Sequence, residues 1–248
     1  MENQILTVNH LCVSFQDNSN KIFGKRKQID VLKDISFSIK EGEIVGLVGE
    51  SGCGKTTLAQ TILKLNTRYT GEIRNEDPYP QMIFQDPYSS LNPSKTISFL
   101  LREPLLLRSS LQREEQEKRI DEMLERVGLS SGYKNRYPSE LSGGQRQRIC
   151  IAQALMLEPR LLIADEPVSA LDVTIQAQIM KLLSNLHQEM GLSILFISHD
   201  LRIVYQICDR VMIMQNGMIV EEGDIDEVYH NPQDEYTKTL LESAGIHL

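Results

Sequence analysis

The chain has no tryptophan, and aromatic residues make up only 6% of its 248 residues. No apolar stretch approaches the ~20 residues that a membrane-spanning helix requires. The first residues, Met1–Gln4, include no basic group and no long apolar run follows them, which argues against a signal peptide. We therefore expect a cytosolic protein that is attached to a membrane, at most, through a partner.

Cysteine is scarce, and the four residues present lie too far apart for a C-x-x-C metal or redox pair. We expect isolated thiols in a reducing compartment. They are Cys12, Cys53, Cys150 and Cys208.

Positive charge is in deficit, with 26 Lys and Arg against 34 Asp and Glu and a formal net charge of -8. The sequence therefore offers no basic field for nucleic acid, and we expect none as the main partner. Hydrophobic residues at 41% and charged residues at 24% are ordinary for a globular protein. The length suits one large α/β domain or one domain with an inserted subdomain.

The segment Gly49–Thr56 fits the phosphate-loop pattern G-x-x-x-x-G-K-[ST]. An apolar stretch at 43–48 predicts a buried strand before it, and helical spacing at 57–65 predicts a helix after it. Such a loop aims backbone N–H groups and a helix dipole at one anion, while Lys55 reaches the β/γ-phosphates and Thr56 offers a hydroxyl to Mg²⁺. A chance match would occur in roughly one chain per hundred, and the flanking elements make chance rarer still. We conclude that the chain binds a nucleoside triphosphate.

Strand and helix patterns alternate along much of the chain, which predicts a mostly parallel sheet covered on both faces. Residues 17–30 are polar and basic and predict an exposed loop. Residues 88–136 have a helical pattern instead, and we expect an inserted helical subdomain there. The expected strands are 5–8, 11–15, 36–39, 70–73, 81–84, 160–164, 193–198 and 211–214, and the expected helices include 145–157 and 173–190.

Two adjacent carboxylates, Asp165 and Glu166, follow an apolar run that predicts a buried strand. Ligands of α/β proteins gather at strand ends, where one carboxylate can hold Mg²⁺ and the next can polarise a water molecule. By itself the pair is equally consistent with an ordinary loop. The phosphate loop upstream favours the catalytic interpretation.

The segment Leu141–Gln145 has a serine and two glycines at the start of a predicted helix, which can bind an anion. A plain helix N-cap at Ser142 is the simpler explanation. One chain does not need two phosphate-binding loops for one triphosphate, unless the second loop serves a nucleotide held by another subunit.

With these segments taken together, the chain resembles the nucleotide-binding subunits of ABC transporters over essentially its whole length. The resemblance rests on motifs in a fixed order, which is more specific than any one of them. They are Gly49–Thr56 like the Walker A loop, Gln85 like the Q-loop glutamine, Leu141–Gln145 like the ABC signature, Leu161–Asp165 like Walker B, Glu166 like the catalytic glutamate, Ser169–Asp172 like the D-loop, and His199 like the switch histidine.

The resemblance implies a P-loop NTPase (RecA-like) α/β core with a parallel sheet, an N-terminal antiparallel β subdomain and an inserted α-helical signature subdomain. It implies one nucleotide-binding domain over 1–248, with the helical part at 88–158. It also implies ATP hydrolysis with Mg²⁺. The resemblance assigns catalytic roles to Glu166, His199 and Gln85. It assigns Mg²⁺ contacts to Thr56, Gln85 and Asp165. The expected nucleotide contacts are Phe15, Gly49, Glu50, Ser51, Gly52, Cys53, Gly54, Lys55, Thr56, Thr57, Ser142, Gly143, Gly144, Gln145 and Asp172.

Two of these assignments have simpler alternatives. Phe15, expected to stack on adenine, could be a core residue of an early strand. A lone histidine at a strand end, such as His199, is usually an exposed residue without a function. Here, however, the strand that precedes His199 is the next predicted strand after the one that ends in Asp165. That position predicts a donor near the γ-phosphate.

Within the family, four segments resemble the branch that serves peptide and nickel importers: Gly49–Lys55, Gln85–Pro93, Arg102–Leu105 and the tail Asn231–Thr237. This resemblance implies a second, non-identical ATPase, two transmembrane permease subunits and an extracellular solute-binding protein, with this chain peripheral on the cytoplasmic face of the membrane. Two chains would face head to tail and share each ATP. We expect the permease to dock on an apolar surface at Phe99, Leu100 and Leu101, beside Tyr88.

The chain departs from the family pattern in several places. The stretch 66–80 is shorter than in most relatives, and Gln153 stands where relatives often carry arginine. A soluble ABC ATPase acting on a nucleic-acid or ribosomal complex remains an alternative, as does a nucleotide-binding module without turnover. The cargo stays open among peptides, nickel and a metal–chelator complex.

Overall fold

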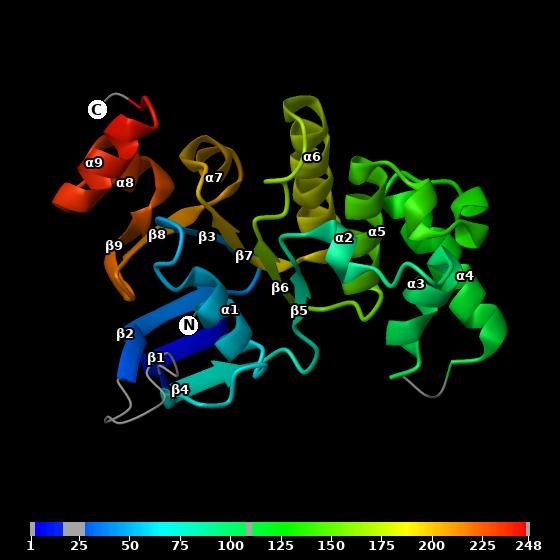
Figure 1. Cartoon of the computed structure of the whole chain (residues 1–248), viewed down its shortest axis with the longest axis horizontal. Coiled ribbons are helices and arrows are strands. Elements are labelled where there is room, and N and C mark those ends of the chain that lie inside the picture. Colours follow the sequence, from blue (N-terminus) through cyan, green and yellow to red (C-terminus); the bar gives the residue numbers. More distant parts are fainter. Residues whose placement is uncertain (1–2, 17–27, 108–110, 247–248) are drawn as a thin grey trace, which may run out of the picture. The chain divides into compact units, whose positions relative to one another are not determined.

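The computed structural model describes residues 3–16, 28–107 and 111–246. The chain divides into two compact units, a first unit of Met1–Glu76 with Ser193–Leu248 and a second unit of Asp77–Leu192. Figure 1 labels their helices and strands. The phosphate loop belongs to the first unit and the Asp165–Glu166 pair to the second, so each unit carries part of the predicted site.

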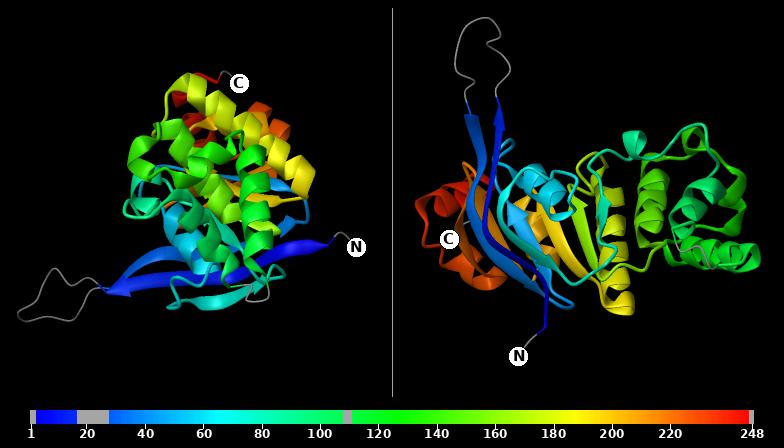
Figure 2. Two further views of the ribbon diagram at one scale, coloured as in Figure 1. Left: turned by 90° about the vertical axis from the view of Figure 1, so that its right-hand side faces the viewer. Right: turned by 90° about the horizontal axis from the view of Figure 1, so that it is seen from below.

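The first unit contains a three-stranded antiparallel sheet in which β1 pairs with both β2 and β4. Figure 2 shows β1 and β2, in blue, as a long ribbon. The two strands expected at 5–8 and 11–15 are one strand, because β1 continues through an irregularity at His10, whose φ is 50°. The bounds are β1 Gln4–Gln16, β2 Gln28–Lys40 and β4 Thr70–Asn75.

The predicted loop at 17–30 lies largely outside the described residues. Its last part, 28–30, is the start of β2 rather than loop. Among the described residues, no helix combines the length and apolar character needed to cross a membrane.

The second sheet of the first unit places β3 between β7 and β8, all parallel. Every residue of β3 and of β7 is buried, as expected for strands covered on both faces. An unpredicted strand, β9, folds back antiparallel to β8. Its signal was the Asn216-Gly217 pair, whose φ values of 49° and 83° suit a tight hairpin turn. The bounds are β3 Ile44–Val48, β7 Ser193–Ser198, β8 Arg210–Gln215 and β9 Met218–Asp224.

Four helices lie in the described part of the first unit. Helix α7 contacts β3 and β7, and α8 contacts β8 and β9. Aspartate caps the N-termini of α7, α8 and α9 by accepting a backbone N–H of the first turn, which explains where these helices begin. The bounds are α1 Lys55–Ile62, α7 Leu201–Ile207, α8 Ile225–His230 and α9 Glu235–Ser243.

The second unit pairs β5 with β6 in parallel and adds α6 at the predicted bounds. Helices cover most of 87–155 among the described residues, in line with the helical pattern of the sequence, and the bounds 88–158 of an inserted helical subdomain stay a prediction. The bounds are β5 Gln81–Ile83, β6 Leu161–Asp165, α2 Pro87–Ser90, α3 Ile97–Leu105, α4 Arg113–Arg126, α5 Gly143–Leu155, α6 Val173–Met190 and the 3₁₀ turns η1 Ser131–Asn135 and η2 Pro138–Glu140.

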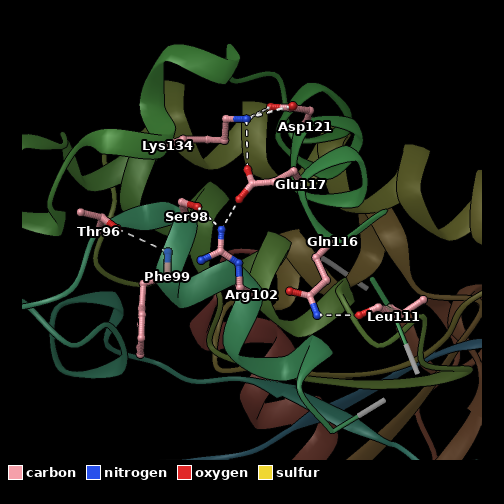
Figure 3. A network of polar contacts seen from close by, with 9 residues as sticks. All are labelled: Thr96, Ser98, Phe99, Arg102, Leu111, Gln116, Glu117, Asp121 and Lys134. Carbon is pink, nitrogen blue, oxygen red and sulfur yellow. Dashed lines mark hydrogen bonds and ion pairs between the residues drawn. The ribbon is translucent and has the colours of Figure 1, made fainter. Parts of the chain in front are cut away.

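A polar network joins α3, α4 and η1 (Figure 3). The Arg102 guanidinium of α3 pairs with Glu117 of α4, and Lys134 of η1 donates to Asp121 at 2.9 Å and to Glu117 at 3.5 Å. The hydrogen bond and charge of Asp121 raise the pKa of Lys134, so its ammonium stays charged. These contacts fix η1, which carries Tyr133, against the helices around it.

Candidate nucleotide-binding and catalytic site

The phosphate loop connects β3 to α1 in the first unit, as predicted. Gly54 is the N-cap of α1 with φ of 117°, a conformation that favours glycine. A Cβ at Gly49 would lie 2.1 Å from the carbonyl oxygen of Met214, so only glycine allows β8 to approach this closely. The loop therefore leads into the N-terminus of α1, where first-turn amides have no intrahelical acceptor and can bind an anion.

Lys55 curls back over this loop. Its ammonium donates to the carbonyl oxygens of Gly49 at 2.7 Å and Glu50 at 2.9 Å, and the side chain is only 7% exposed. A lysine ammonium has three N–H donors, so these two bonds fix its position. The glycine cradle, the helix N-terminus and this anchored positive charge fit a bound polyphosphate.

His199 lies at the same edge of the sheet as the phosphate loop. Ser198, the last residue of β7, pairs with Val48, the last residue of β3, so His199 and Gly49 follow equivalent positions of adjacent parallel strands. His199 is exposed. The fold thus places a possible donor beside the start of the loop, and the predicted contact of His199 with the γ-phosphate stays a prediction.

Phe15 lies on β1, is 44% exposed and pairs with Ile29 of β2, so it is not a core residue. Two residues earlier on the same strand, Val13 pairs with Leu32, and a Cβ at Gly54 would lie 2.9 Å from the Leu32 side chain. The ribbon that carries Phe15 therefore runs past the phosphate loop. Stacking of Phe15 on adenine stays a prediction.

In the second unit, the structure brings Gln85 and Glu166 together. Ile83 of β5 pairs with Ala164 of β6, so the segments that follow both strands leave the same edge. The amide Nε2 of Gln85 donates to the Glu166 carboxylate at 2.9 Å. Asp165, the last residue of β6, is buried at 4% exposure.

Glu166 adopts a left-handed backbone conformation with φ of 48°, which is uncommon for a residue other than glycine. Both the N–H and the hydroxyl of Ser169 donate to its carbonyl oxygen, at 3.3 and 3.2 Å. Backbone strain of this kind concentrates at functional sites. The turn directs the Glu166 carboxylate toward Gln85.

Ser142 is the N-cap of α5, so the simpler interpretation of this residue is correct in part. Its hydroxyl accepts the backbone N–H of Gln145 at 3.3 Å, and the side-chain oxygen Oε1 of Gln145 accepts the backbone N–H of Ser142 at 2.9 Å, a reciprocal capping box. The side chain of Gln145 also donates to the Tyr133 hydroxyl at 2.9 Å. The anion-binding role of Ser142, Gly143 and Gly144 stays a prediction that this rigid helix start supports.

Asp172 is the N-cap of α6 and accepts the Ile175 N–H at 3.0 Å. Its predicted nucleotide contact stays a prediction. The first unit thus contains Phe15, the whole phosphate loop and His199, while the second contains Gln85, Ser142–Gln145, Asp165, Glu166 and Asp172. Within the described residues, no group of three or more His, Cys, Asp or Glu is arranged to hold a metal alone; Mg²⁺ in phosphate sites typically uses one or two carboxylates plus substrate oxygens.

Two tyrosines outside the sequence motifs contact residues of the predicted site. Tyr133 supports the signature glutamine, and the Tyr236 hydroxyl accepts the Glu50 N–H across 186 positions of sequence. No local pattern predicts such distant contacts. Asp77 is buried at 5% exposure and its carboxylate accepts the backbone N–H groups of Arg160 and Leu161 at the start of β6.

A cavity of about 240 Å³ lies in the second unit beside β5 and α5. Gln153, the residue that departs from the family pattern, lines it together with Phe84 and Pro104. In the same unit, Tyr88 is 64% exposed and Phe99 is 38% exposed, but Leu100 and Leu101 are buried at 2% and 0%. The prediction that Leu100 and Leu101 form a docking surface is therefore wrong, because that face of α3 packs inward.

A glycine loop at a helix N-terminus, an anchored lysine, and a carboxylate paired with a glutamine at a strand edge define a P-loop nucleoside triphosphatase. A model of the ABC transporter family matches residues 32–169, more than half of the chain. The chain therefore belongs to the ABC transporter family. As a member it is an ATPase, the ATP-binding subunit of a transporter.

Sequence relatives and solved structures agree with this assignment to the ABC transporter family. The chain is 45% identical to the oligopeptide transport ATP-binding protein OppF of Haemophilus influenzae, over 98% of this chain and 78% of the relative. It is 43% identical to OppF of Bacillus subtilis, over 99% and 84%, and 43% identical to the dipeptide transport ATP-binding protein DppF of Escherichia coli, over 90% and 71%.

Two solved structures have the same fold. CbiO1 from Clostridium perfringens, part of the ABC transporter complex cbiONQ, aligns with a TM-score of 0.77 and 29% identity over 100% of this chain and 96% of that one. A dimeric ATP-binding cassette in a post-hydrolysis state, bound to ADP and Pi, aligns with a TM-score of 0.76 and 28% identity over 89% and 98%. The α/β cassette fold with its antiparallel β part is thus confirmed.

Proposed function

We propose that this chain is the ATPase of a peptide importer and acts on the cytoplasmic face of the membrane. The names of its relatives, oligopeptide and dipeptide transport ATP-binding proteins, support a peptide cargo. Nickel and metal–chelator complexes are the competing cargoes. In this proposal, 1–248 is one nucleotide-binding domain with the helical part at 88–158 inserted.

ATP binds through the phosphate loop, with backbone contacts from Gly49–Thr57 and the Lys55 ammonium on the β/γ-phosphates. Thr56, Gln85 and Asp165 would hold Mg²⁺, which neutralises phosphate charge. Glu166 polarises the attacking water and His199 donates to the γ-phosphate. The observation that supports this chemistry best is the 2.9 Å hydrogen bond between Gln85 and Glu166, because it orients a strained glutamate at a strand edge.

Two cassettes close head to tail, so that Ser142–Gln145 of one chain contacts the ATP held by the other chain. The dimeric ADP- and Pi-bound cassette among the structural neighbours supports this arrangement. Closure requires that ATP bind the closed pair more tightly than the open one.

The test compares Lys55→Ala with Ser142→Arg in a titration of the full chain with a fluorescent ATP analogue. We expect Lys55→Ala to reduce binding to a small residual level, detectable only at high analogue concentration, because it leaves phosphate charge uncompensated. Ser142→Arg should spare binding and block only ATP-dependent association, measured by light scattering. Equal loss of binding in both variants would show that the signature serves its own chain's nucleotide, contrary to the proposal.

The partners are two permease subunits, a solute-binding protein and a second, non-identical ATPase. The cavity beside Gln153 and the exposed rings of Tyr88 and Phe99 offer the permease a docking site in the second unit. Purification of the tagged chain from its own membranes tests the partners. Recovery of the chain alone, without permease or a second ATPase, would favour the soluble alternative.

A further inference from the structure

The tail Asn231–Thr237 supports the resemblance to peptide importers but has no role in the function proposed above. In the structure it is held firmly. The Glu221 carboxylate of β9 accepts the Gln233 N–H at 2.7 Å and the Asp234 N–H at 3.2 Å. Asp234 in turn caps α9 by accepting the Tyr236 N–H at 2.9 Å. Tyr236 therefore projects from a fixed point of the first unit.

The hydroxyl of Tyr236 accepts the backbone N–H of Glu50 at 3.3 Å. The carbonyl of the same peptide group belongs to Gly49, and it accepts the Lys55 ammonium at 2.7 Å. One peptide plane at the start of the phosphate loop is thus held at both ends, by Tyr236 on one side and by Lys55 on the other.

A peptide group is planar and turns as one body. A rotation that breaks the bond to Tyr236 also turns the Gly49 carbonyl away from Lys55, so the tyrosine and the lysine share one constraint. A Cβ at Gly49 would lie 2.1 Å from the Met214 carbonyl oxygen, so β8 limits the other movements of this peptide.

We propose that Tyr236 is a positioning residue for nucleotide binding: its hydroxyl orients the Gly49–Glu50 peptide and thereby holds the Lys55 ammonium where it meets the β/γ-phosphates. The inference rests on the proposed function in one respect, that Lys55 binds phosphate. It gives the tail a role as part of the nucleotide site.

The chemistry of the hydroxyl suits this role. Burial raises the pKa of Tyr236 above its ordinary value, so the hydroxyl stays protonated and uncharged. A neutral phenol accepts an N–H without placing a second negative charge near the phosphates, and it keeps its own proton to donate.

The test measures the dissociation constant of the full chain for a fluorescent ATP analogue with Mg²⁺. Tyr236→Phe keeps the ring and removes one hydrogen bond, and we expect the dissociation constant to rise about three- to tenfold. Tyr205→Phe is the matched control, because its hydroxyl donates to Asp226 at 2.8 Å on the exposed surface of α7. The control should bind like the wild type.

A double-mutant cycle separates positioning from general stability. If Tyr236 acts through Lys55, Tyr236→Phe should weaken residual binding less than twofold in a Lys55→Ala background. A full three- to tenfold loss in that background would overturn the proposal. So would wild-type affinity in Tyr236→Phe together with a lowered Tm, which would give Tyr236 a structural role only. If Lys55→Ala itself bound ATP normally, that result would contradict the proposed nucleotide site and not only the positioning role of Tyr236.

Amide hydrogen exchange provides a second, independent readout. We expect the Glu50 N–H to be protected in the wild type and to exchange at least tenfold faster in Tyr236→Phe. An unprotected Glu50 amide in the wild type would show that the hydrogen bond to Tyr236 does not form, which would overturn the proposal. This measurement needs only the wild type, so it holds even if the variant folds poorly.

Discussion

Glu166 combines a left-handed backbone with a hydrogen bond from Gln85, so the structure holds its carboxylate in one orientation. We expect Glu166→Gln to bind ATP normally, because Lys55 is untouched, and to lower kcat at least about 100-fold, as for loss of a general base. The measurement is steady-state phosphate release in the assembled complex. Glu189→Gln, which replaces an exposed carboxylate of α6, should retain full activity. Near-normal turnover of Glu166→Gln would refute the assignment.

The four thiols differ in environment. Burial raises the pKa of Cys150 to about 12 and raises the pKa of Cys208 further. The thiolate is the nucleophile, so these two thiols should not react with iodoacetamide at pH 8 in the folded protein, while the half-buried Cys12 and Cys53 should. Mass spectrometry of the peptides measures this.

ATP should protect Cys53 selectively, because it lies in the phosphate loop, whereas Cys12 on β1 serves as the internal control. In guanidinium all four thiols should react. Labelling of Cys150 in the folded chain as rapidly as Cys12 would contradict the burial argument.

At the scale of elements, one buried carboxylate fixes the start of β6. Asp77 accepts the N–H groups of Arg160 and Leu161 at 2.7 and 2.8 Å. Asp77→Ala leaves these groups without that acceptor, and we expect the free energy of unfolding to fall by about 1–3 kcal/mol. Urea unfolding followed by circular dichroism measures it. Asp77→Asn should lower the free energy of unfolding less, because the amide oxygen of the asparagine can still accept these N–H groups. The control Glu189→Ala should leave the free energy of unfolding nearly unchanged. Equal stability of the Ala variant and the wild type would contradict the capping role.

At the scale of the whole molecule, transport requires that the ATPase cycle reach the permease. We expect Phe99→Glu to reduce peptide uptake at least tenfold in reconstituted vesicles, because the charge is desolvated at the proposed docking site. Nucleotide affinity should change less than twofold. Met218→Glu, at another exposed apolar residue, in β9, is the control. Normal uptake with Phe99→Glu would move the docking site elsewhere.

The amino-acid sequence by itself determined the local motifs and the helices and strands that carry them. The phosphate loop, the strand ending in Asp165, the signature segment and α6 were all predicted at or close to their observed positions, because each depends on residues adjacent along the chain: a glycine run, an apolar strand, a capping serine. The Asn216-Gly217 pair is a local signal of the same kind, since its two positive φ values suit the tight turn between β8 and β9.

Only the tertiary structure decided which side chains meet. It buried Leu100 and Leu101 while leaving Phe99 exposed, joined Gln85 to Glu166 through the register of β5 and β6, and brought Tyr236 to Glu50 from the far end of the sequence. Local patterns cannot encode these contacts, because burial and distant hydrogen bonds depend on how folded elements pack and not on the spacing of residues within any one of them.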